Sequence, residues 1–236
     1  MEVLLFAIAL VAYQLSRMIV IGDARDAAKN AWEIIGFEKA YGIFFESDVQ
    51  RWMLDNLHVT QFLNHFYVWA HLPITALFFV WLYRRHQDVY PFVRNAFFVA
   101  NAAALAVFVF YPVAPPRLMN GEGFVDTLEI ISGIDLHAGS LSGWFNPFAA
   151  VPSMHFAYAL MIGVVSACLI RHWPLRLLVL TYPFVVFVTI VGTANHYVLD
   201  AIAGGAVMGS AFAATALWRR WRGRADSAAS STVCAQ

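Results

Sequence analysis

The sequence predicts an all-α, polytopic membrane protein, in which six transmembrane helices form one bundle and an amphipathic helical segment lies at the interface after the first span. Hydrophobic residues make up 61% of the 236-residue chain, charged residues only 13%, and the mean hydropathy is +0.63. Six stretches also approach or reach the length of about 20 apolar residues that a helix needs to cross the hydrocarbon core. They are residues 3 to 21, 60 to 83, 95 to 113, 152 to 170, 174 to 193 and 197 to 218.

The charge balance excludes one class of function. Lys and Arg total 15, as do Asp and Glu, so the formal net charge is zero. Nucleic acid is therefore not expected as a partner, because no basic excess is present to neutralise phosphates. The two cysteines, Cys168 and Cys234, are too few for a disulfide framework and lack metal-site spacing.

The first apolar stretch is expected to be a retained span. It has no basic region before the apolar run, and Gly22 and charged residues follow it rather than a small-residue cleavage site. Residues 23 to 55 then carry eleven charges of both signs, with apolar residues at roughly helical spacing. They predict one or two amphipathic helices, which we interpret as a solvated cover over the bundle.

The other five stretches complete a single membrane domain over residues 1–222, with a motif-bearing core at about 58–218. Their final helix carries small residues at every fourth position, which predicts a face for close helix packing: Ala201, Gly205, Gly209 and Ala213. The Ala- and Ser-rich residues 223–236 predict a disordered cytoplasmic tail.

Basic residues near the span ends predict the orientation. Arginines flank the second and fourth connections and the C-terminal end, which places these ends in the cytoplasm: Arg84, Arg85, Arg94, Arg171, Arg176, Arg219, Arg220, Arg222 and Arg224. The segment 114–151 has only Arg117 against four acidic residues, of which Asp126 and Asp135 are expected to be solvated. Six spans in a cell membrane then leave both termini cytoplasmic and this segment outside.

Polar residues of three separate stretches are predicted to meet at the outer ends of the spans. Arg117 follows span three, His155 lies at the start of span four, and His196 and Asp200 lie at the start of span six. Charged and imidazole groups are costly in a membrane and by default mark function or an internal pair. We therefore expect the functional site at the extracytoplasmic face.

His196 and Asp200 are four residues apart, so a helix places them on one face. A carboxylate beside an imidazole fixes its tautomer and raises its basicity, which suits a histidine nucleophile or base. A purely structural His–Asp pair has the same spacing and is the alternative.

The stretch Pro152-Ser153-Met154-His155 predicts a helix start. Free backbone N–H groups at such an end favour an anion, so Ser153 is a candidate phosphate donor and His155 a candidate acid for a leaving group. An ordinary Ser cap with an interfacial His is the alternative.

Arg117 ends a stiff, proline-rich exit from span three and suits bidentate phosphate contact, with anchoring to lipid head groups as the alternative. His71 lies within span two, where we expect a satisfied interhelical hydrogen bond; a hinge or a partner of the site are the alternatives. Arg17, within span one, has no single interpretation.

The three ordered motifs together resemble the type 2 phosphatidic acid phosphatase superfamily, whose pattern is an Arg-bearing motif, then Pro-Ser-x-His, then His-x-x-x-Asp. Their forms here are Tyr-Pro-x-Ala-Pro-Pro-Arg, Pro-Ser-Met-His and Asn-His-Tyr-x-Leu-Asp. They are similar to the inositolphosphotransferase branch, which includes inositolphosphorylceramide synthase. The resemblance covers about residues 58 to 218.

The resemblance implies a metal-independent enzyme that acts on a lipid phosphate ester or pyrophosphate, with no cofactor. It implies that His196 attacks phosphorus to give a phosphohistidine, that Asp200 orients it, and that His155 protonates the leaving oxygen. Arg117, with Ser153 and its helix start, then holds the phosphoryl oxygens. Water or an alcohol resolves the intermediate, so hydrolysis and inositol-phosphoryl transfer to a lipid alcohol both remain open. The partners are lipid substrate and membrane lipids; the oligomeric state, a homo-oligomer included, stays open.

Two cations of the broader superfamily pattern are missing. Phe110 replaces a Lys and Ile190 replaces an Arg, while Leu118 replaces a Pro. These departures favour the inositolphosphotransferase-like branch. Replacement candidates are Thr193 and Asn195 as donors and Arg17 as a charge.

Two other classes compete with an enzyme of this kind. His155, His196 and Asp200 match the ligand set of a facial metal triad, which chelator sensitivity tests. A transporter is the third class, but the two halves of the chain show no inverted repeat.

Overall fold

The computed structural model describes residues 2, 6, 11, 23–119, 121–135 and 147–233, with side chains as far as residue 222. Regular structure in this part of the chain is helical, apart from one isolated parallel bridge between Val113 and Ala149. The all-α prediction is confirmed for it. Most of the predicted span at 3 to 21, with Arg17, lies outside the described residues.

The helices follow one another with short connections. They are α2 (Ala24–Ala40), α3 (Glu46–Asp55), α4 (Leu57–His65), the π-helix η1 (Phe66–Ala70), α5 (His71–Arg85), α6 (Tyr90–Phe110), the 3-10 helix η2 (Pro116–Leu118), α7 (Thr127–Ser132), α8 (Met154–Leu169), α9 (Trp173–Gly192) and α10 (Val198–Val233).

Four described segments are long and apolar enough to cross a membrane: Leu57–Arg85, Tyr90–Phe110, Trp173–Gly192 and Val198–Arg222. They correspond to the second, third, fifth and sixth predicted spans. The fourth predicted span is α8, an apolar helix of 16 residues, which is shorter than these four. The count of six spans therefore stays a prediction.

Small residues let α6, α8 and α10 pack closely in the core. Ala100 of α6, Ala157 of α8 and Ala211 of α10 are buried in one cluster. At Gly204 of α10, a Cβ atom would overlap the carbonyl oxygen of Ser153, so only glycine fits there. The predicted small-residue face is thus wrong at Gly209 and Ala213, which are exposed because α10 packs through the neighbouring face that contains Gly204.

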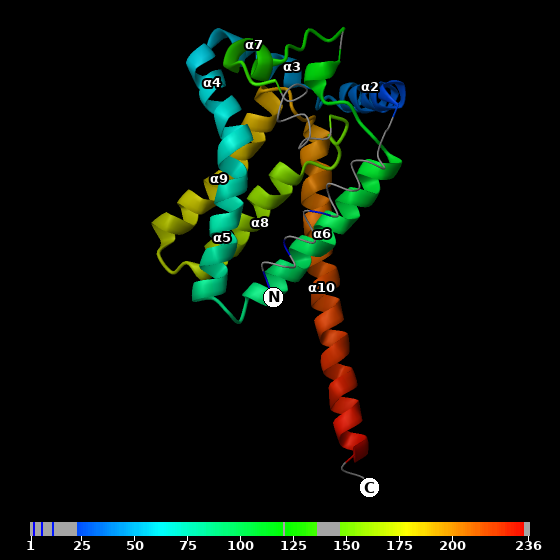
Figure 1. Ribbon diagram of the computed structural model, residues 1–236, viewed down its shortest axis with the longest axis vertical. Coiled ribbons are helices and arrows are strands. Elements are labelled where there is room, and N and C mark those ends of the chain that lie inside the picture. Colours follow the sequence, from blue (N-terminus) through cyan, green and yellow to red (C-terminus); the bar gives the residue numbers. More distant parts are fainter. Residues whose placement is uncertain are drawn as a thin grey trace.

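Helices α2, α3 and α7 lie at one end of the bundle, and α10 extends beyond the other helices at the opposite end (Figure 1). Helix α2 buries one face, formed by Ala27, Ala31, Ile34, Ile35 and Glu38. Its amphipathic pattern agrees with the sequence, whereas its place at a membrane interface stays a prediction. Helix α10 continues to Val233, where the sequence predicted a tail from 223; the disorder of that tail and the domain limits also stay predictions.

Two described residues of the N-terminal segment contact the bundle. Phe6 packs on Phe79 and Phe97, with ring centroids 5.3 and 5.9 Å apart. Glu2 accepts hydrogen bonds from Tyr90 and from Arg94, at 2.7 and 2.6 Å. The N-terminal segment therefore meets α5 and α6.

Candidate active site

Five sequence-predicted site residues, Arg117, Ser153, His155, His196 and Asp200, lie at the end of the bundle covered by α2 and α7. Backbone hydrogen bonds join the segments that hold them. Arg117 N–H donates to the Ala194 carbonyl at 2.8 Å, and Ser153 N–H donates to the Asp200 carbonyl at 2.9 Å. The start of α8, the start of α10 and the segment after α6 therefore meet at one place.

The imidazole of His196 is held by two acceptors at the same nitrogen. Its Nδ1 lies 2.9 Å from the Ala150 carbonyl oxygen and 3.1 Å from Asp200 Oδ2. A carbonyl oxygen only accepts, so Nδ1 carries the proton and Nε2 of the neutral ring keeps its lone pair. Burial lowers the pKa of His196 to about 4, the Ala150 contact opposes this, and Arg117 lowers the pKa further. The ring is then neutral and nucleophilic near pH 7.

Asp200 is fully buried in the first turn of α10. Its Oδ2 accepts from Tyr197 N–H at 2.9 Å as well as from His196, while Oδ1 has no hydrogen-bond partner among the described residues. The carboxylate thus occupies the helix end, where negative charge is favoured, and fixes the His196 ring at the same time.

The guanidinium of Arg117 is fixed by two side chains. Its Nε donates to Asn195 Oδ1 at 2.9 Å, and its Nη1 lies 3.2 Å from Asp126 Oδ2. Asn195 in turn donates from Nδ2 to Thr193 Oγ1 at 2.8 Å, so its amide is already engaged. In this arrangement Asn195 and Thr193 orient Arg117, and their direct contact with phosphate stays a prediction.

Asp126 corrects an expectation from the sequence, which treated it as a solvated loop charge. It pairs with Arg117 and also accepts from the N–H groups of Leu128 and Glu129, at 3.1 and 3.3 Å. The side chain therefore caps α7 and links that helix to the site, which spacing along the chain did not reveal.

Ser153 caps α8 as its alternative interpretation predicted. Its Oγ accepts from Phe156 N–H at 3.4 Å, and the residue is buried. The hydroxyl hydrogen remains to be donated, so the cap and a phosphate contact are compatible. The role of Ser153 toward phosphate stays a prediction.

His155 is held by rings. Its centroid lies 4.3 Å from that of Tyr67, 4.9 Å from that of His71 and 5.9 Å from that of His196. His155 makes no hydrogen bond to the described part of the chain. Nothing in the sequence singled out Tyr67, because its contact depends on how η1 packs against α8.

Two buried glutamates complete the start of α10. Leu199 N–H donates to Glu38 Oε1 at 2.6 Å, and Val198 N–H donates to Glu46 Oε1 at 2.8 Å. Burial, helped by the neighbouring Glu46, raises the pKa of Glu38 to about 9, so Glu38 is protonated near pH 7. Sequence reasoning missed both residues, although Glu38 continues the apolar face of α2.

The remaining predicted positions bring no further charge to the site. Phe110 is exposed and Ile190 is buried, and Arg17, Trp144 and Phe145 lie outside the described residues. Within the described ranges, no group of three His, Cys, Asp or Glu side chains is arranged to hold a metal ion.

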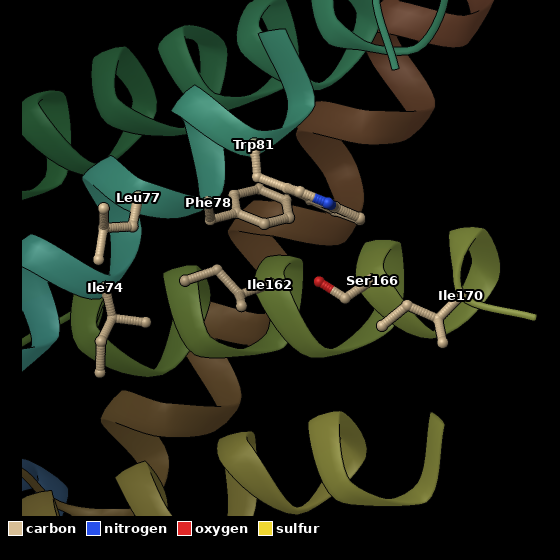
Figure 2. Close-up of a pocket in the computed structure, with 7 residues that line it drawn as sticks. All are labelled: Ile74, Leu77, Phe78, Trp81, Ile162, Ser166 and Ile170. Atoms are coloured by element: carbon tan, nitrogen blue, oxygen red, sulfur yellow. The ribbon is translucent and has the colours of Figure 1, made fainter. Parts of the chain in front are cut away.

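An apolar groove lies between α5 and α8 (Figure 2). It is lined by Ile74, Leu77, Phe78, Trp81, Ile162, Ser166 and Ile170. None of these side chains is a titratable group or a metal ligand, so the groove supplies no chemistry of its own.

Comparisons with known proteins agree with the motif pattern. The sequence profile of the PAP2 superfamily matches residues 32–214. Phosphoinositol dihydroceramide synthase of Bacteroides thetaiotaomicron is similar, with 27% identity over 149 residues, which cover 56% of this chain and 48% of that protein. This chain thus spans about half the length of that curated relative. No solved structure matches the chain.

Proposed function

Because this chain belongs to the PAP2 superfamily, as the ordered motifs predicted, we propose that it is an integral-membrane lipid phosphatase or phosphotransferase that works through a phosphohistidine at His196. The observation that carries this proposal is the environment of that ring. Ala150 and Asp200 both bind Nδ1, which leaves the Nε2 lone pair to attack phosphorus.

The reaction proceeds in two displacements. In the first, Nε2 of His196 bonds to phosphorus while the bond from phosphorus to the leaving oxygen breaks, and protonated His155 gives its proton to that oxygen. In the second, a hydroxyl attacks phosphorus, its proton passes to neutral His155, and the electron pair of the P–N bond returns to His196. Both histidines regain their starting states.

The phosphoryl oxygens are held by Arg117 and by the start of α8 at Ser153. The Arg117 side chain is only 6% exposed and is fixed by Asn195 and Asp126, so it is oriented before substrate arrives. Donors fixed in advance toward developing charge commonly supply the largest part of catalysis.

Transfer to an alcohol is the favoured outcome of the second displacement. The similar protein from Bacteroides thetaiotaomicron is named for the synthesis of phosphoinositol dihydroceramide. The two missing cations at Phe110 and Ile190 also separate this chain from the phosphatase pattern. We therefore propose inositol-phosphoryl transfer to a lipid alcohol as the specific activity, with hydrolysis as the alternative.

The proposed topology has six spans, cytoplasmic termini and an extracytoplasmic site. Arg84 and Arg85 end α5, and Arg176 lies in the first turn of α9, both far along their helices from the end that carries His196. Such a separation of arginines from the site supports this orientation.

The test uses detergent-purified protein with EDTA present. A panel of lipid phosphates is assayed for phosphate release, and inositol phospholipids are assayed with lipid-alcohol acceptors for new phospholipid products. We expect a phospholipid product in the wild type and none with His196→Ala. His65→Ala, at an exposed histidine of α4, is the matched control and should keep full activity. Normal product formation by His196→Ala would contradict the proposal.

A further inference from the structure

His71 is a buried histidine with one nitrogen unused. It is 1% exposed, and its Nδ1 lies 2.9 Å from the Tyr182 hydroxyl of α9. The expected interhelical hydrogen bond is thus present. Its Nε2, however, has no hydrogen-bond partner among the described residues. A buried polar atom without a partner is costly, and such an atom needs a reason.

The surroundings of His71 point to His155. The centroids of the two rings are 4.9 Å apart and their planes differ by 37°. The π-helix η1 directly precedes His71, and its Tyr67 stacks on His155 at 4.3 Å. Single π-helical turns occur frequently at functional sites. Here the wide turn presents two rings, four residues apart, to the same face of His155.

We propose that His71 is a positioning residue for His155, whose Nε2 lone pair accepts an N–H of protonated His155 and holds that ring ready to donate to the leaving oxygen. This rests on the proposed function. Tyr182 makes it feasible, because its hydroxyl oxygen accepts from Nδ1–H and so leaves Nε2 unprotonated. His155 gives and regains its proton in each cycle, and His71 keeps its own.

Other groups that face this pair come from three further elements. Tyr158 of α8 and Tyr182 of α9 stack on His71 with centroids 6.0 and 6.1 Å away, and His196 lies on the other side of His155. All are uncharged when His196 is neutral. His71 is therefore the neighbour able to stabilise a positive charge on His155.

The test compares His71→Ala with the wild type on lipid substrates that have alkyl or activated aryl leaving groups. A hydrogen bond to a charged group predicts a fall in kcat of about 10- to 100-fold for alkyl leaving groups, with little change in KM. Aryl leaving groups, which need no acid, should lose much less. The limb on which kcat falls as pH rises should move to lower pH, because protonated His155 has lost its acceptor.

His71→Gln, whose side-chain oxygen still accepts, should restore most of the rate and is informative even if His71→Ala fails to fold. Thr75→Val, one turn further along α5, is the packing control. Equal losses on both leaving groups, or an unmoved pH limb, would overturn the inference. If His196→Ala stays active, the proposed function itself fails; if only the His71 variants behave normally, this inference alone fails.

Discussion

His196 and His155 lie with ring centroids 5.9 Å apart, yet the molecule holds them by different means. His196 is fixed by hydrogen bonds to Ala150 and Asp200, in a region where carboxylates also bind the first N–H groups of α10. His155 is held between rings, on Tyr67 and beside His71. Hydrogen bonds select one tautomer, whereas stacking fixes the ring plane and leaves both nitrogens free to change protonation.

This difference matches the two proposed roles. A nucleophile needs its lone pair at one nitrogen throughout the reaction, which the fixed Nδ1–H of His196 secures. A general acid must lose and regain a proton, and a strong fixed partner would hold one protonation state. The comparison can be broken or sharpened by the three variants below.

Asp200→Asn should have the largest effect, a fall in kcat of about 1000-fold, because the amide no longer stabilises the positive charge that develops on His196. The loss should be equal for alkyl and aryl leaving groups, since it acts on the nucleophile. Initial rates on both substrates, with gel filtration to verify folding, check this. A loss below tenfold would mean that Ala150 alone is enough to hold the ring.

His155→Ala should reduce kcat by about 100-fold for alkyl leaving groups, in the range expected of a general acid. Activated aryl phosphates should lose less than about tenfold, because their leaving oxygen needs no proton. The measurement is kcat over a series of leaving groups of different pKa. A uniform loss across the series would argue against an acid role and against the comparison drawn above.

Glu38→Gln should have the smallest effect, confined to stability at high pH. The folded-state pKa of Glu38 is raised to about 9, so its stabilising contribution is full below the ordinary value of 4.5 and is lost as pH rises through 9. Glutamine stays neutral and still accepts from Leu199. The thermal midpoint in detergent should therefore fall less between pH 6 and pH 9 in the variant than in the wild type.

Glu33→Gln, at an exposed position of the same helix, is the matched control and should leave the pH dependence unchanged. An identical pH dependence in Glu38→Gln and wild type would mean that Glu38 does not hold its proton at the start of α10.

The sequence predicted what depends on local pattern. Four spans matched because length and hydropathy are properties of a continuous stretch, and the pairing of His196 with Asp200 followed from a spacing of four. Contacts across long separations were missed. Glu38 meets Leu199, and Glu46 meets Val198, across more than 150 residues, and helical periodicity reports which face is buried but not what it meets.

The same limit explains the misjudged packing of α10. Small residues at every fourth position identified a plausible face, but Gly204 on the adjacent face makes the close contact with Ser153. Asp126 was likewise treated as solvated because its partner, Arg117, comes from the other side of a loop.

That contact at Gly204, together with the hydrogen bond from Ser153 N–H to the Asp200 carbonyl, joins the helix that carries His155 to the helix that carries His196 through backbone atoms alone. The spacing of the two reactive rings is thus independent of the residues at the rim of the site. Substitutions in α2, α7 and the segment after α6 can alter which head group or acceptor is admitted without changing that spacing. One reactive centre is thereby compatible with the divergence of hydrolases and transferases during evolution.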